Sequence, residues 1–133
     1  MKYIGPDFCN ITSLLTDEEL LIQKTANQFV QQEFNPIVNE YYEKGSFPLE
    51  LLPKMGELGF FGATLPKEFG GSEISSTAYG LIMHELEKGD SGLRSLCSVQ
   101  GGLVMYPIYK YGTDEQKKKW LPQLSAGTAI GCF

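Results

Sequence analysis

Apolar side chains recur every three or four residues along most of this chain, which is the spacing of an amphipathic helix. The first such stripe follows Thr16 and reaches Phe34. Thr16 opens the run Thr-Asp-Glu-Glu, a capping box in which Glu19 offers its amide to the threonine and its carboxylate to the cap. A helix is therefore predicted from Thr16, with a break or kink at Pro36 and an end at Gly45.

Two further helical patterns follow, with a loop between them. Ser46 is the candidate N-cap of the first, a short helix in which Pro53 marks an early turn. Residues 60–76 are rich in glycine and proline and are expected to form a loop whose phenylalanines lie over the core. One of the two serines at the end of this loop caps the next helix, which closes at Gly89.

The longest predicted helix is the segment from 89 to 112. It begins with a row of small polar residues, becomes apolar, and is expected to loosen or kink near Gly101 and at Pro107. Thr113 then opens a second capping box, Thr-Asp-Glu-Gln, so a last helix is predicted. Its buried anchors are expected to include Trp120, while three lysines occupy its wet face.

These patterns predict an all-α protein, an up-down helical bundle of about five helices. Residues 1–133 are expected to form one domain, with residues 1–15 as an irregular lead-in. Residues 128–133 are small and β-prone, and they are typical of the start of a strand that has no sheet to join here.

Composition places the chain among ordinary globular proteins, with 42% hydrophobic and 20% charged residues. A formal net charge of -5 argues against a nucleic-acid partner. Three cysteines without metal-ligand spacing argue against a disulfide framework or zinc, and so favour a reducing, cytoplasmic location. The N-terminus has no signal-peptide or transit-peptide pattern, and no apolar run is long enough to span a membrane.

No catalytic or metal-binding set emerges from the residue types. The single histidine, His84, stands beside acidic residues, but a metal site needs several converging ligands. One histidine without a placed serine also defines no catalytic triad. We therefore expect His84 to lie at the surface or half-buried, and we assign no catalytic, metal-ligating or cofactor-binding residue.

One polar constellation remains, formed by Glu87, Arg94, Ser95 and Ser98. Arg94 lies in the first turn of the long helix, where the helix dipole favours anions, so it requires an anionic partner. That partner is either an acidic neighbour, Glu87 or Asp90, or a ligand. In the ligand interpretation Arg94 binds a carboxylate, Ser95 and Ser98 add hydroxyl donors, and Glu87 orients the guanidinium.

A row of small residues runs along the same helix. Ser91, Ser95, Ser98 and Gly102 fall at helical spacing. Such a row lets another group approach the helix backbone closely. Two alternatives explain this row of small residues: close packing of a neighbouring helix, or the approach of a ligand.

Three segments of the chain, 55–71, 78–112 and 114–133, resemble the N-terminal α-helical domain of the flavin-dependent acyl-CoA dehydrogenases. Within the second segment, the run DSG-x-RS-x-x-SVQ at 90–100 is similar to the glutaryl-CoA dehydrogenase branch. The resemblance extends over nearly everything from residue 16 onward.

The resemblance implies oxidation of an acyl-CoA thioester between its α and β carbons, with the hydride passing to FAD. In the glutaryl branch, which belongs to amino-acid degradation, the substrate also loses carbon dioxide and leaves crotonyl-CoA. The arginine and serine that match Arg94 and Ser95 contact the distal carboxylate there, with an acidic residue matching Glu87 beside them. The branch has serine where this chain has Gly101 and Gly102, which alters the pocket wall.

The resemblance also implies that most of the enzyme lies elsewhere. In the family, the strand that starts near residues 130–133 continues into a β-domain with a flavin-binding motif, and a second helical domain supplies the catalytic glutamate. FAD binds mainly between those parts and a neighbouring subunit, and relatives tend to be homotetramers. We therefore expect this chain to form one wall of the acyl pocket, without the base and without the flavin site.

Two alternatives stay open. The parent enzyme is a dehydrogenase for another short acyl-CoA in which Arg94 is structural, or the 133 residues are a non-catalytic helical interaction module. Substrate competition on the complete enzyme distinguishes the first alternative from a glutaryl-CoA dehydrogenase. The length of the open reading frame distinguishes the second alternative, the interaction module, from an enzyme domain.

Overall fold

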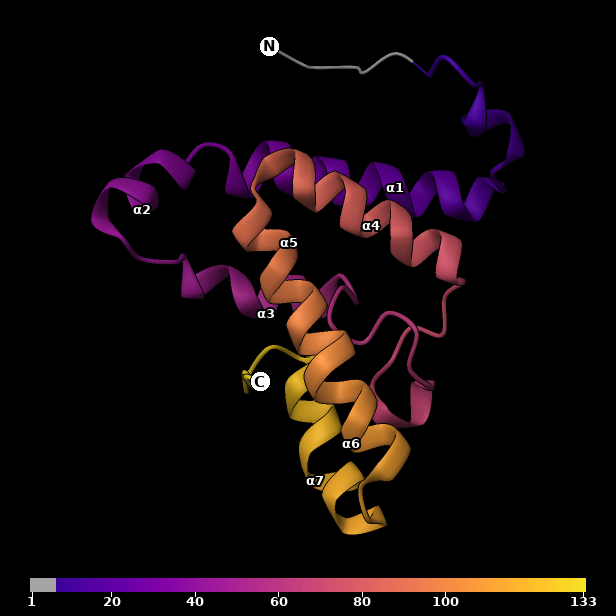
Figure 1. Ribbon diagram of the computed structural model, residues 1–133, viewed down its shortest axis with the longest axis vertical. Helices are drawn as coiled ribbons and strands as arrows, with labels where there is room; N and C mark the ends of the chain where they lie inside the picture. Colours follow the sequence, from indigo (N-terminus) through magenta and orange to yellow (C-terminus); the bar gives the residue numbers. More distant parts are fainter. Residues whose placement is uncertain (1–6) are drawn as a thin grey trace.

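The computed structural model describes residues 7–133, and each regular element in that part of the chain is helical (Figure 1). The α-helices are α1 (Asp17–Phe29), α2 (Val38–Lys44), α3 (Leu52–Glu57), α4 (Ser76–Gly89), α5 (Ser91–Ser98), α6 (Tyr106–Tyr111) and α7 (Asp114–Ser125). In Figure 1, α1 and α4 lie side by side, and α7 folds back beside the rod that α5 and α6 make together. The predicted all-α fold is confirmed.

The helix axis is carried across two junctions by π-helical turns. One, Val30–Phe34, extends α1 toward the break at Pro36, and the other, Val99–Met105, joins α5 to α6. The loosening predicted near Gly101 is therefore a π turn within a continuous helix. Single 3₁₀ turns occupy Ile11–Leu14, Leu49–Leu51 and Lys67–Phe69.

Both predicted capping boxes form. The amide of Glu19 donates to the Thr16 hydroxyl at 3.2 Å, and the Thr16 amide donates back to the Glu19 carboxylate at 3.0 Å. Thr113 and Gln116 make the same reciprocal pair at the start of α7. The Ser75 hydroxyl caps α4 and also donates to Glu19 at 2.9 Å, so the N-termini of α1 and α4 are tied together.

A single hydrophobic core lies between these helices. Its largest fully buried side chains include Phe34, Met55, Phe60, Phe61, Leu86, Leu93, Met105 and Leu121. The rings of Phe29 and Phe60 meet edge to face with centroids 5.5 Å apart, a geometry that aromatic pairs favour. The predicted placement of the loop phenylalanines over the core is confirmed, and this packing holds α5 against the rest of the bundle.

Two local predictions are wrong. Ser46 does not cap a helix, because the chain is irregular there and the first turn begins after Pro48 without a side-chain cap. Trp120 is 41% exposed rather than an anchor of α7, whose buried contacts come from Leu121 and Leu124. The indole lies under the Lys119 ammonium, 4.7 Å from the ring centroid, on the outer face of the helix.

The ends of the described chain are less regular. Residues 128–133 follow α7 without strand geometry, because a strand forms only against a neighbour; the strand expected there stays a prediction. The first six residues of the predicted lead-in lie outside the described part. Across residues 7–133, no helix has the length and apolar character needed to cross a membrane.

Candidate functional site

The turn between α4 and α5 explains where the polar constellation sits. Asp90 separates the two helices in an extended conformation, and its carboxylate accepts the Leu93 amide at 3.0 Å. The negative charge that the helix dipole favours at the start of α5 is thus supplied by Asp90. Arg94, one turn further on, extends toward α4 and pairs with Glu87.

Glu87, Arg94, Ser95 and Ser98 together form what we call the Arg94 corner. The Arg94 Nε donates to Glu87 Oε2 at 2.6 Å, and its Nη1 donates to the Ser98 hydroxyl at 3.3 Å. Ser98 in turn donates to the carbonyl of Ser95 at 3.0 Å. The structure therefore brings the four predicted residues together in one chain of hydrogen bonds.

The guanidinium keeps unused donors. Arg94 is the only arginine of the chain, and its side chain is 35% exposed while that of Glu87 is 48% exposed. Among residues 7–133, no hydrogen bond engages the Arg94 Nη2 or the Ser95 hydroxyl. Because a guanidinium carries five N–H groups, the Nη side of Arg94 remains able to bind a carboxylate while Glu87 holds Nε.

Gly102 is the last member of the row of small residues, and its neighbour Gly101 has different surroundings. A Cβ added at Gly101 would lie 2.8 Å from the carbonyl oxygen of Phe61, so close packing explains that glycine. A Cβ added at Gly102 would meet nothing within 4 Å. The packing interpretation therefore holds for Gly101, whereas Gly102 borders space that this part of the chain leaves open.

Tyr79 is a neighbour of the Arg94 corner that the sequence interpretation missed. It is half-buried on α4, where burial raises its pKa and the Arg94 charge opposes that rise. Tyr79, Met83 and Glu87 follow one another at four-residue spacing, which is the signal that places them along one face of α4.

Cys97 is not a reactive thiol. It is fully buried one turn beyond Arg94, and burial raises its pKa to about 12. The protonated thiol donates to the carbonyl of Phe60 at 3.2 Å. A thiol in that state is a poor nucleophile, so Cys97 serves packing.

His84 lies on the outer face of α4 with a side chain that is 65% exposed, as the sequence predicted. Within the described residues, no group of three or more histidine, cysteine or acidic side chains gathers to hold a metal ion. The three cysteines, Cys9, Cys97 and Cys132, are free thiols.

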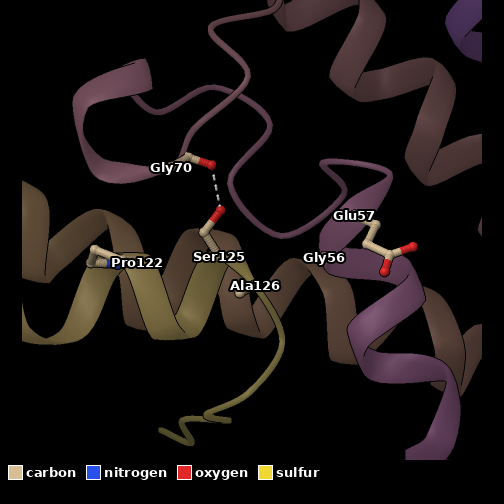
Figure 2. A pocket seen from close by; sticks show the side chains of 6 residues that line it. All are labelled: Gly56, Glu57, Gly70, Pro122, Ser125 and Ala126. Carbon is tan, nitrogen blue, oxygen red and sulfur yellow. Dashed lines mark hydrogen bonds between the residues drawn. The ribbon is translucent and has the colours of Figure 1, made fainter.

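A shallow pocket of about 270 Å³ lies between the ends of α3 and α7 (Figure 2). Gly56, Glu57, Gly70, Pro122, Ser125 and Ala126 line it. The Ser125 hydroxyl donates across it to the carbonyl of Gly70 at 2.6 Å. Glu57 is its only charged lining residue, and none of the lining residues belongs to the Arg94 corner.

Comparison with known proteins matches residues 16–128 to the family described as acyl-CoA dehydrogenase, N-terminal domain. A short-chain specific acyl-CoA dehydrogenase from Bos taurus mitochondria is 33% identical over 119 residues, which are 90% of this chain and 29% of that protein. A 3-(aryl)acrylate reductase from Clostridium sporogenes is 38% identical over 118 residues, 89% of this chain and 31% of that protein.

Among solved structures, a glutaryl-CoA dehydrogenase from Mycobacterium smegmatis in complex with FADH2 is similar to this fold. The TM-score is 0.90 and the identity is 43%, over 93% of this chain and 32% of that one. The chain therefore spans about a third of the length of the relatives it matches.

Proposed function

This chain belongs to the acyl-CoA dehydrogenase family as its N-terminal helical domain, and from that premise we propose that it forms one wall of the acyl pocket in an FAD-dependent glutaryl-CoA dehydrogenase. The complete enzyme would oxidise glutaryl-CoA between its α and β carbons and release carbon dioxide, leaving crotonyl-CoA. In this proposal the chain contributes substrate selection rather than the chemical step, since the resemblance assigns the catalytic glutamate to a second helical domain.

The observation that carries the proposal is the state of Arg94. Glu87 and Ser98 hold the guanidinium from Nε and Nη1, and the Nη2 donors stay unused among the described residues. A glutaryl chain differs from a butyryl chain by its distal carboxylate, the group that such donors bind. Removing one partner from a buried charge pair costs about 2–5 kcal/mol, which is enough to separate the two substrates.

The 43% identity between this chain and the glutaryl-CoA dehydrogenase of M. smegmatis supports this proposal. Glu87, Arg94, Ser95 and Ser98 would then line the part of the pocket that receives the distal carboxylate.

FAD enters the proposal as the hydride acceptor of the complete enzyme. The pocket in Figure 2 does not fit the pyrophosphate of a flavin cofactor, because its lining offers a carboxylate and no cation. Following the family resemblance, we assign FAD to the remaining domains and to a neighbouring subunit of a homotetramer. The free thiols of Cys9, Cys97 and Cys132 fit the reducing cytoplasm that we assign to the protein.

A second candidate function is dehydrogenation of another short acyl-CoA, with Arg94 in a structural role. The observation that favours it is the ion pair between Arg94 and Glu87, which is complete without any ligand. A third candidate is a non-catalytic helical interaction module. The exposure of Leu103, Tyr106 and Phe133, which are 48%, 49% and 98% exposed, favours that one.

The test replaces Arg94 by Gln in the complete enzyme and measures kcat/KM for glutaryl-CoA and butyryl-CoA. We expect glutaryl-CoA turnover to fall by about 100-fold or more, and butyryl-CoA turnover to stay within a few-fold of wild type. Lys24→Gln, which removes the same charge from an exposed site on α1, is the control and should change neither. Equal loss on both substrates excludes the carboxylate role and leaves the short-chain enzyme.

Reading the encoding frame past Phe133 tests the interaction module. A frame that continues through a flavin-binding motif and a later helical domain with a glutamate base excludes the module. A stop codon at that point excludes the dehydrogenase.

A further inference from the structure

Outside the Arg94 corner, the buried amide side chain of Gln100 makes three hydrogen bonds to the main chain. It is 1% exposed, and its Nε2 donates to the carbonyls of Leu124 and Ala129, both at 2.9 Å. Its Oε1 accepts the amide of Gly131 at 3.0 Å. Both N–H groups and the carbonyl of one side chain are thereby committed to the main chain of α7 and of the segment that follows it.

An amide is the one side-chain group that matches these three partners. Two carbonyl acceptors require two N–H donors, and the Gly131 amide requires an acceptor on the same side chain. Methionine has no N–H donor and no strong acceptor. An ionised glutamate would place a negative charge next to the two carbonyl oxygens and be repelled by them. A buried polar group left without partners costs about 1–3 kcal/mol, so each of these bonds is costly to lose.

The two segments that Gln100 joins have different roles. Gln100 lies in the π turn Val99–Met105, two residues beyond Ser98 of the Arg94 corner. Its partners Ala129 and Gly131 lie in the irregular segment after α7. A Cβ added at Gly131 would come within 2.4 Å of the Val104 side chain, so packing and hydrogen bonding hold this segment against the same turn.

We propose that Gln100 is a positioning residue that fixes segment 129–131 to the helix carrying Arg94, through its hydrogen bonds to Ala129 and Gly131. The inference rests on the proposed function, in which that segment leads into the domain holding the flavin. Gln100 then sets the distance between the wall of the acyl pocket and the reacting centre. It contacts neither substrate nor cofactor.

The first test replaces Gln100 by Met, which keeps the length of the side chain and removes its hydrogen bonds. In the complete enzyme, kcat per bound flavin should fall by about 10-fold or more, because small displacements of a pocket wall are costly to catalysis. The factor should be the same for glutaryl-CoA and butyryl-CoA, with KM unchanged. Gln32→Met, at an exposed site beyond α1, is the matched control and should leave kcat unchanged.

Hydrogen exchange tests the tether itself. In the full chain as encoded, amide exchange across 128–133 should accelerate about 10-fold or more in Gln100→Met, because the Gly131 amide loses its acceptor. Unchanged exchange overturns the proposal, and so does faster exchange with unchanged kcat per flavin.

Gln100→Glu supplies a second variant in case Gln100→Met does not fold. At high pH the introduced carboxylate faces two carbonyl oxygens, and burial and those oxygens raise its pKa. On acidification the carboxyl becomes protonated and donates one hydrogen bond, so kcat should recover relative to wild type as the pH falls. A ratio to wild type that does not vary with pH overturns the proposal.

The two proposals can be excluded separately. If Arg94→Gln lowers kcat/KM equally for both substrates, the assignment to glutaryl-CoA is excluded, whereas the expected effect of Gln100→Met on kcat is unchanged. If Gln100→Met has no effect on kcat, the positioning role is excluded, whereas the expected substrate selectivity of Arg94 is unchanged.

Discussion

Helix α4 carries two carboxylates, two residues apart, whose surroundings are opposite. Glu85 is 2% exposed and accepts from Lys88 at 2.8 Å, Asn27 at 2.9 Å and Gln23 at 3.0 Å. Glu87 is half exposed and has one partner, Arg94. The Glu85 cluster, as we call the first set of four residues, ties α1 to α4, whereas Glu87 belongs to the Arg94 corner.

The difference shows how structural and functional charges are distinguished. In the Glu85 cluster, both carboxylate oxygens are bonded within the fold, so no site remains for a ligand. In the Arg94 corner the carboxylate holds one edge of the guanidinium, and Nη2 stays unused among residues 7–133. A buried charged group whose hydrogen-bonding atoms are all paired within the fold contributes to stability. A charged side chain that is held in place but keeps an unused donor is available to bind a ligand.

The largest effect should follow from breaking the Glu85 cluster. Glu85→Ala leaves Lys88, Asn27 and Gln23 without their acceptor, and removing one partner of a buried pair costs about 3 kcal/mol or more. Lys88 is 30% exposed, so we expect about 2–3 kcal/mol, measured by urea unfolding of this domain. Glu87→Ala is the matched control and should cost less than about 1 kcal/mol; equal costs would contradict the distinction.

A smaller effect is the pH dependence that the same cluster confers. Burial acts to raise the pKa of Glu85, but hydrogen bonds from Lys88, Asn27 and Gln23 and the Lys88 charge outweigh it, and the pKa lies below its ordinary value of 4.5. The folded state therefore binds this proton less tightly than the unfolded state, so the stabilisation is full above pH 4.5 and lost as the pH falls through the folded pKa.

The measurement compares the free energy of unfolding of wild type and Glu85→Gln across that range. The difference between them should be constant near neutral pH and shrink below pH 4.5. His84, whose Nδ1 lies 3.9 Å from the Glu85 carboxylate, is controlled for by repeating the series in His84→Gln. A difference that grows on acidification would contradict the prediction.

Glu87→Gln tests whether the Arg94 corner contributes to substrate binding rather than to stability. The neutral amide still accepts from Arg94 but no longer holds it by charge, so the guanidinium is less well oriented toward a substrate carboxylate. We expect the ratio of kcat/KM for glutaryl-CoA to that for butyryl-CoA to fall by about 5- to 10-fold, with unfolding changed by less than about 1 kcal/mol. A large loss of stability with an unchanged ratio would reverse the assignment.

The smallest effect should come from Ser98→Ala. Its hydrogen bond from Arg94 is long, at 3.3 Å, and partly exposed. Losing it should lower the same substrate ratio by about 2- to 3-fold, corresponding to about 0.5 kcal/mol. Ser91→Ala, on an exposed residue about two turns earlier, provides the comparison and should leave the ratio unchanged.

The parts of the fold that depend on local chemistry were predictable from the sequence. The boxes at Thr16 and Thr113 are reciprocal hydrogen bonds within four residues, so their residue types suffice to locate them. The proximity of Glu87, Arg94 and Ser98 also follows from helical spacing across one short turn.

The parts that depend on distant partners were not predictable. The hydrogen bonds that saturate Glu85 could not be predicted, because its partners Gln23 and Asn27 lie about 60 residues away and carry no local signal. Gln100 escaped notice for the same reason, since its partners lie in segment 124–131. Trp120 was assigned to the core because of its type, and the position of α7 turned it outward.

The π turn at Val99–Met105 marks the place where this helix holds one residue more than an α-helix of the same span. Deleting one residue there would convert the π turn to α-helix, and the tighter winding of the α-helix would largely offset the missing residue. Each α-helical residue turns the chain by about 100°, so the same deletion within α5 would rotate everything beyond it by that angle. A single-residue deletion should therefore be tolerated at the π turn and not within α5.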